Sequence, residues 1–68
     1  MRLSARNQIP GRITSIDFDG LMAEVNVDIG NERTITSVIT RRSADAMGLR
    51  AGDEVTVVVK STEVMIAK

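Results

Sequence analysis

The stretch Leu21-Met22-Ala23-Glu24-Val25-Asn26-Val27-Asp28-Ile29 carries the clearest pattern in this chain. Apolar residues occupy every second position from Leu21 onward, and this period of two predicts a β-strand with one buried face. Gly30-Asn31 then predicts a hairpin turn into a second strand over residues 34–40. Upstream, residues 12–18 predict an earlier strand, with a bend or a sheet edge at Pro10-Gly11.

Residues 41–49 interrupt the β pattern and predict one short helix. Ser43 fits the N-cap of this helix, and Gly48 fits its C-terminal stop. Two further strands are predicted after the helix, over residues 55–60 and 64–66. The expected fold is therefore all-β, a small five-stranded OB-like barrel with one short helix between strands 3 and 4. An SH3-like barrel is the alternative, but it accounts less well for the helix.

The composition limits how such a barrel can be stabilised. With 68 residues, the chain is expected to form one domain, residues 1–68, with a small core. It has no Cys for disulfides, no His for a metal site, and a single aromatic residue, Phe18. Small domains of this kind often gain stability by association. We therefore expect an oligomer.

The charge and the residue types argue against several classes of function. Nine basic and nine acidic residues give a net charge of zero, which is unlike a nucleic-acid binder with a basic stripe. Without Cys or His, neither a transition-metal site nor nucleophilic catalysis by these residues is expected. We therefore predict that the protein is not an enzyme and that it needs no catalytic cofactor. No apolar run is long enough for a membrane span or a signal peptide, and the predicted location is cytoplasmic.

The outward faces of the predicted strands indicate an interface. If the alternating Val and Ile residues fill the barrel, Met22, Val38, Val58 and Met65 point outward. An exposed apolar patch on so small a barrel favours a contact between subunits. Two polar residues share these outward faces, Thr40 and Lys60.

Two clusters of hydrogen-bond donors lie near the two ends of the chain. The first is Ser4-Ala5-Arg6-Asn7-Gln8 and the second is Lys60-Ser61-Thr62, and neither has a carboxylate at its centre. Taken singly, such residues are typical of a polar terminus, a solvated strand or a turn. Together, donors and cations without acceptors suit a fully deprotonated anion such as molybdate, tungstate or sulfate. The candidate ligands are Ser4, Ala5, Arg6, Thr40, Lys60 and Ser61.

The first cluster, followed by Gly11, resembles the opening of the molbindins, the small Mop-type molybdate-binding proteins. Residues 36–40 and 59–66 are similar to the other two signatures of that family. The resemblance implies an OB-like barrel that assembles as a hexamer, a trimer of dimers, with oxyanions bound at subunit interfaces. It also implies that residues 1–8 form an arm that packs on a neighbouring subunit.

The resemblance further implies how the site is divided between subunits. Ser4 and Arg6 would come from one subunit, and the neighbour would supply Thr40, Lys60 and Ser61.

The family also has a second class of site near its three-fold axes, for which Ser37 is the candidate here. The implied function is intracellular molybdenum storage and homeostasis, with molybdate or tungstate as the ligand and no nucleic acid or membrane as partner. Two alternatives are a nucleic-acid-binding OB module and a purely structural oligomerisation domain.

Overall fold

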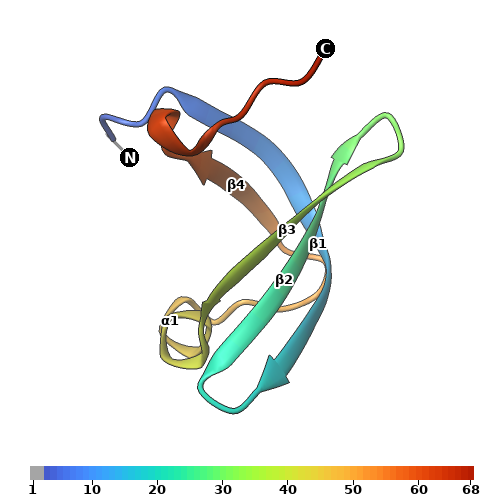
Figure 1. Cartoon of the computed structure of the whole chain (residues 1–68). Helices are drawn as coiled ribbons and strands as arrows, with labels where there is room; N and C mark the ends of the chain where they lie inside the picture. The colour runs from blue at the N-terminus through green and yellow to red at the C-terminus, as the bar shows by residue number, and fades with distance from the viewer. Residues whose placement is uncertain (1–2) are drawn as a thin grey trace.

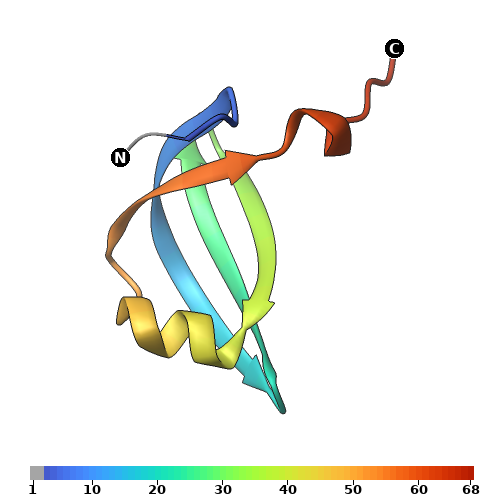
Figure 2. The ribbon, with the colours of Figure 1, turned by 90° about the vertical axis from the view of Figure 1, so that its left-hand side faces the viewer.

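The computed structural model describes residues 3–68 of this chain. Four antiparallel strands form one curled sheet in the order β3-β2-β1-β4, and a helix lies at one end of it (Figure 1 and Figure 2). In chain order the elements are β1 (Asn7–Asp19), β2 (Met22–Gly30), β3 (Arg33–Thr40), α1 (Arg41–Met47), β4 (Glu54–Val59) and the 3₁₀ turn η1 (Ser61–Glu63). The predicted all-β class, with a short helix after the third strand, is confirmed.

The hairpin of β2 and β3 follows the alternation in the sequence. Ala23, Val25 and Val27 are buried, and β2 pairs with β3 in antiparallel register up to a turn after Gly30. The strand does not include Leu21, which was predicted to start its buried face. Leu21 lies in the turn before β2 and is 84% exposed. Leu21 continues the alternation of apolar residues although it lies outside the strand. The pattern of residue types alone does not show whether an apolar side chain is buried in a strand or exposed in a turn.

The strand β1 runs through the Pro10-Gly11 pair rather than starting after it. Its first half pairs with β4, from Asn7 opposite Val59 to Arg12 opposite Glu54. Its second half pairs with β2, beginning with Arg12 opposite Asp28. The change of partner brings Gly11 so close to β2 that a Cβ there would lie 2.6 Å from Val27 Cγ1. Gly11 therefore permits the close approach that lets one long strand join two halves of the sheet.

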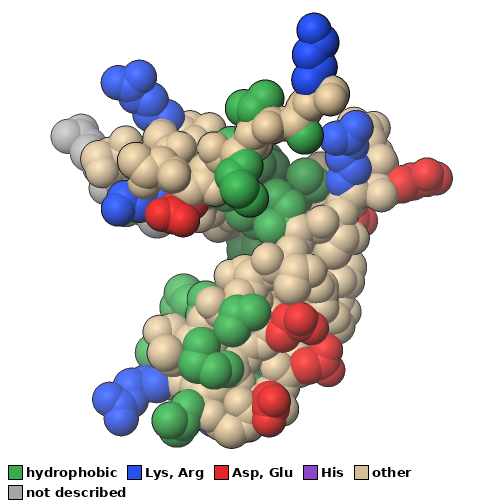
Figure 3. Space-filling view, viewed as in Figure 1, with side chains coloured by type: hydrophobic (Ala, Val, Ile, Leu, Met, Phe, Trp, Pro, Cys, Tyr) green, Lys and Arg blue, Asp and Glu red, His purple; other side chains and the backbone are tan. Residues whose placement is uncertain are grey.

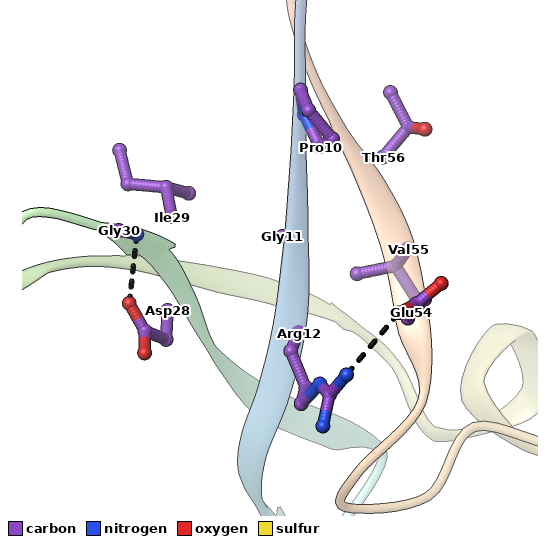
Figure 4. A pocket seen from close by; sticks show the side chains of 9 residues that line it. All are labelled: Pro10, Gly11, Arg12, Asp28, Ile29, Gly30, Glu54, Val55 and Thr56. Carbon is purple, nitrogen blue, oxygen red and sulfur yellow. Dashed lines mark hydrogen bonds and ion pairs between the residues drawn. The ribbon is translucent and has the colours of Figure 1, made fainter.

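The outer side of this junction forms a groove of about 590 Å³ between β2 and β4 (Figure 4). An ion pair between Arg12 and Glu54, 3.2 Å long, bridges β1 and β4 there. Both side chains are largely exposed, so the pair contributes little to stability.

The core lies on the concave face of the sheet. Ile13, Val25 and Val27 form its buried centre. Partly buried residues from every strand and from the loop after α1 pack around them, namely Ile16, Ile29, Ile39, Leu49, Val55 and Val57. The core is small, as the chain length predicts.

The helix α1 begins one turn earlier than its predicted N-cap. Thr40 is the N-cap, and its hydroxyl accepts a hydrogen bond from the Ser43 backbone N–H at 3.0 Å. The prediction of Ser43 is therefore wrong, because Thr40 meets the same chemical requirement three residues earlier. The predicted stop is confirmed, since Gly48 caps the helix with φ 61°. Within residues 3–68, no helix combines the length and the apolar character that crossing a bilayer requires.

The predicted fifth strand is absent from the described residues. After η1 the chain is extended at Val64, yet Met65 and Ile66 are 91% and 89% exposed and pair with no strand. The terminal segment 64–68 leads away from the sheet in both ribbon views (Figure 1 and Figure 2). The sequence pattern was compatible with a strand, but a strand also needs a neighbouring edge, which a single chain does not offer at this position.

Candidate functional site

The two donor clusters from the two ends of the chain lie side by side. Asn7 is opposite Val59 in the β1–β4 ladder, so the residues before Asn7 lie next to those after Val59. The side-chain amide of Asn7 donates to the Val59 carbonyl at 3.3 Å and to Ser61 Oγ at 3.5 Å. These contacts bring Ser4–Arg6 and Lys60–Ser61 together at one end of the molecule (Figure 1).

The adjacency is found within one chain, whereas the sequence predicted that the two clusters meet across a subunit boundary. Asn7 and Gln8 belong to β1 and pair with the β4 of their own chain. The exchange of the arm, residues 1–8, between subunits stays a prediction, and its first two residues lie outside the described part of the chain.

The side chains at this end are open to solvent, and two of the candidate ligands are cations. Ser4, Arg6, Lys60 and Ser61 are exposed, and Ala5 is half-buried. Within residues 3–68 the one ion pair joins Arg12 and Glu54, so neither Arg6 nor Lys60 is neutralised by a carboxylate. Two cations and several hydroxyl or N–H donors therefore remain available for an anion.

Thr40 lies at the opposite end of the sheet from these residues. It ends β3 and pairs with Met22, which in turn pairs with Asp19, the last residue of β1. Asn7 begins the same strand at its far end. The structure therefore does not bring Thr40 to Lys60 within one chain, although both were expected from the same subunit.

The surroundings of Thr40 combine basic, acidic and apolar groups. An open hollow of about 800 Å³ there is lined by Leu21, Thr40, Arg41, Arg42, Asp45 and Ala46. The Arg41 guanidinium lies 4.5 Å from the centroid of the Phe18 ring, and its Nε donates to the Gly20 carbonyl at 2.8 Å. The Arg41 side chain therefore packs and hydrogen-bonds at the turn between β1 and β2.

Acidic residues gather on the outer face near Thr40. Asp17 lies directly opposite Glu24 across the β1–β2 ladder, and Asp19 is two residues further along β1. Figure 3 shows acidic side chains together over the lower part of the sheet. The end that carries both donor clusters has a carboxylate as well, that of Glu63 in η1.

Ser37, the candidate for a second class of site, lies apart from the donor clusters and from the hollow at Thr40. It is half-buried near the middle of β3 and lines a cavity of about 190 Å³ between β3 and β4. Its neighbours there include Ile39 and Val57, and the lining is mainly apolar. Nothing cationic lines this cavity among the described residues, so the setting does not favour an anion in a single chain.

Sequence reasoning left three polar side chains out of the site. Gln8 Nε2 donates to the Ala5 carbonyl at 2.8 Å, and Asn7 holds Ser61 as described above. Ser43 Oγ lies 2.8 Å from Thr40 Oγ1. Asn7 and Gln8 were visible as donors in the sequence, but their partners depend on the strand register, which the sequence does not determine.

Comparison with known proteins shows the family to which the chain belongs. Residues 3–66 match the TOBE domain. The chain belongs to the TOBE-domain family. This TOBE-domain protein is 41% identical over 66 residues to Molybdenum-pterin-binding protein 1 of Clostridium pasteurianum, with 97% of each chain covered.

Two solved structures have the same fold as this TOBE-domain protein. MopII from Clostridium pasteurianum matches with a TM-score of 0.92 at 40% identity, covering 98% of this chain and 100% of that chain. A molybdate-binding protein from Sporomusa ovata matches with a TM-score of 0.94 at 31% identity, covering 100% of both chains. The resemblance to the Mop-type proteins is therefore confirmed.

The named relatives are binding proteins rather than enzymes. Within residues 3–68, no three His, Cys, Asp or Glu side chains converge in a way that could hold a metal ion. The chemistry that the described site offers is donation of hydrogen bonds and positive charge to an oxyanion.

Proposed function

We propose that this protein binds molybdate, with tungstate as a second ligand, and serves cytoplasmic molybdenum storage and homeostasis without catalysis. The observation that carries the proposal is the pairing of Asn7 with Val59, which assembles donors from both ends of the chain at one place. The choice of molybdate among the anions that fit such a site is supported by the relatives, which are named as a molybdenum-pterin-binding protein and a molybdate-binding protein.

We place the arm where it lies in the single chain, paired with its own β4, rather than exchanged between subunits. In the proposed site one chain then supplies five of the six ligand residues. Arg6 and Lys60 balance the two negative charges of the anion, Arg with a planar fork and Lys as a point charge. The other three are Ser4, Ala5 and Ser61, which donate through hydroxyl or backbone N–H groups. Hydrogen bonds to a charged group contribute about 1.5–3 kcal/mol each, so a few of them suffice for specific binding.

The sixth ligand, Thr40, must come from another copy of the chain, because it lies at the far end of its own sheet. Apolar side chains flank both halves of this proposed contact. Met22 and Val38 are exposed near Thr40, and Val58 is exposed two residues before Lys60. Covering these side chains favours association. The proposed assembly is a hexamer, a trimer of dimers, with the anion between subunits.

Calorimetric titration with molybdate tests this proposal. The parent protein is expected to bind, and Arg6→Ala and Lys60→Ala are each expected to weaken binding about tenfold or more, since each removes a charge-assisted bond. Arg33→Ala is the matched control, because it removes an equal charge from the first residue of β3, outside the proposed site. If both site variants bind like the parent, the site is misplaced; if the parent does not bind, the function is wrong.

A further inference from the structure

We infer that Asn7, Gln8 and Ser43 make the proposed site selective for anions that carry no proton, by hydrogen-bonding the acceptor atoms of the ligand residues. None of the three is itself a proposed ligand. The inference rests on the proposed function, since it concerns how that same site distinguishes between anions of equal charge.

The contact between Thr40 and Ser43 shows the principle most directly. A hydroxyl oxygen can accept two hydrogen bonds and donate one. Thr40 Oγ1 already accepts from the Ser43 backbone N–H at 3.0 Å, and it lies 2.8 Å from Ser43 Oγ. When the Ser43 hydroxyl donates to Thr40, both acceptor positions of Thr40 are filled. The Thr40 hydroxyl can then make only one more hydrogen bond, in which it donates its own proton to the anion.

The free chain can reach this state by a simple rotation. Without a ligand, the Thr40 hydroxyl donates to Ser43. An anion beside Thr40 attracts the Thr40 proton, and the Ser43 hydroxyl turns to donate to the oxygen of Thr40. Only two hydroxyl rotors move, and no hydrogen bond is lost.

The other half of the site also has acceptors that receive a bond from a neighbouring side chain. Ala5 lies between Ser4 and Arg6 in the sequence, so its carbonyl is a backbone acceptor beside these two donors. Gln8 Nε2 donates to that carbonyl at 2.8 Å. The orientation of the amide is fixed, because a carbonyl oxygen can only accept. Asn7 donates to Ser61 Oγ at 3.5 Å and so fills one of the two acceptor positions of that hydroxyl, whose proton can be donated to the anion.

The consequence is discrimination between anions of equal charge. Molybdate has oxygens that only accept, whereas hydrogenphosphate has one O–H that needs an acceptor. Each acceptor position that is already occupied is closed to that O–H, and an O–H left unpaired is penalised. Removing the side-chain donor of Gln8 or Ser43 frees an acceptor and should lower this penalty.

The test compares binding of molybdate and of phosphate, each alone, at a slightly alkaline pH where phosphate is mainly the dianion. The parent should prefer molybdate. Gln8→Ala and Ser43→Ala should each reduce the ratio of the two affinities about three- to tenfold, as expected for one hydrogen bond. Ser43→Thr restores the hydroxyl and should restore the ratio.

Ser15→Ala is the matched control for loss of a hydroxyl, because Ser15 accepts a bond from Asn26 on the outer face of the sheet. It should leave the ratio unchanged. Unchanged ratios in Gln8→Ala and Ser43→Ala, with molybdate still bound, overturn the inference while the proposed function stands. No molybdate binding by the parent overturns both. Circular dichroism verifies that each variant is folded. If Ser43→Ala is unfolded, the affinity ratio of Gln8→Ala alone decides whether the inference holds.

Discussion

Asn7 and Val59 are direct partners in the β1–β4 ladder, and the Asn7 side chain also donates to the Val59 carbonyl at 3.3 Å. Residues 52 positions apart in the sequence are thereby held in register by both backbone and side chain. This pairing places the two donor clusters together, and the geometry of the proposed site depends on it.

Asn7→Ala should therefore affect stability and binding together. Loss of the side-chain bonds should lower the free energy of unfolding by about 0.5–1.5 kcal/mol. Molybdate affinity should also fall, because Lys60 and Ser61 are then less firmly held beside Arg6. Urea unfolding and calorimetry measure the two effects. An unchanged affinity in a measurably destabilised Asn7→Ala would show that this bond does not position the site.

Gly11→Ala should destabilise the fold more than an ordinary glycine substitution. The added Cβ would lie 2.6 Å from Val27 Cγ1 and 2.8 Å from the Asp28 carbonyl oxygen, and overpacking of this kind costs about 1–3 kcal/mol. Gly20→Ala is the comparison for backbone strain without overpacking, since Gly20 has φ +57° and a Cβ added there would have no atom within 4 Å. Thermal unfolding should show the larger loss for Gly11→Ala, and the reverse order would contradict the close packing of β1 on β2.

Thr40→Val should shorten or fray α1. It keeps the shape of the side chain but removes the hydroxyl that caps the helix, which costs about 1 kcal/mol. Thr40→Ser retains the hydroxyl and should be close to the parent. Chemical denaturation followed by circular dichroism gives both values. Equal stability of the two variants would mean that the cap contributes nothing.

The local elements of this fold were largely predictable from the sequence. The alternation from Ala23 to Ile29 indicated β2, and Gly48 marked the end of α1, because each signal depends on neighbouring residues alone. The extension of β1 through Pro10-Gly11 was not predictable in this way. It depends on close packing against Val27, which the sequence does not reveal.

The composition of the candidate site stays a prediction from the sequence, whereas its arrangement needed the structure. Charge and donor content select Arg6 and Lys60 as candidates, since these properties belong to single residues. The alternation of side chains along the strands predicted that Thr40 and Lys60 face outward, and both are exposed. This alternation shows which face a residue lies on but not its position along the sheet. It therefore could not show that the two residues lie at opposite ends of the sheet.

The separation of Thr40 from Lys60 leads to a decisive mixing experiment. Thr40→Val and Lys60→Ala should each bind molybdate poorly as pure proteins. If the site joins Thr40 of one chain to Lys60 of another, a mixed oligomer contains some sites in which both residues are intact. Co-refolding the two variants in equal amounts should therefore restore a fraction of the parent's binding sites, detected by calorimetry and by native mass spectrometry of the hexamer.

A mixture of Lys60→Ala with Arg6→Ala is the control for this experiment. The proposed site takes Arg6 and Lys60 from the same chain, and in this mixture every chain lacks one of the two cations. No site in the mixed oligomer can then hold both, so binding should stay as poor as in the pure variants. Absence of recovery in the first mixture, with mixed oligomers present in the mass spectrum, would remove Thr40 from the site.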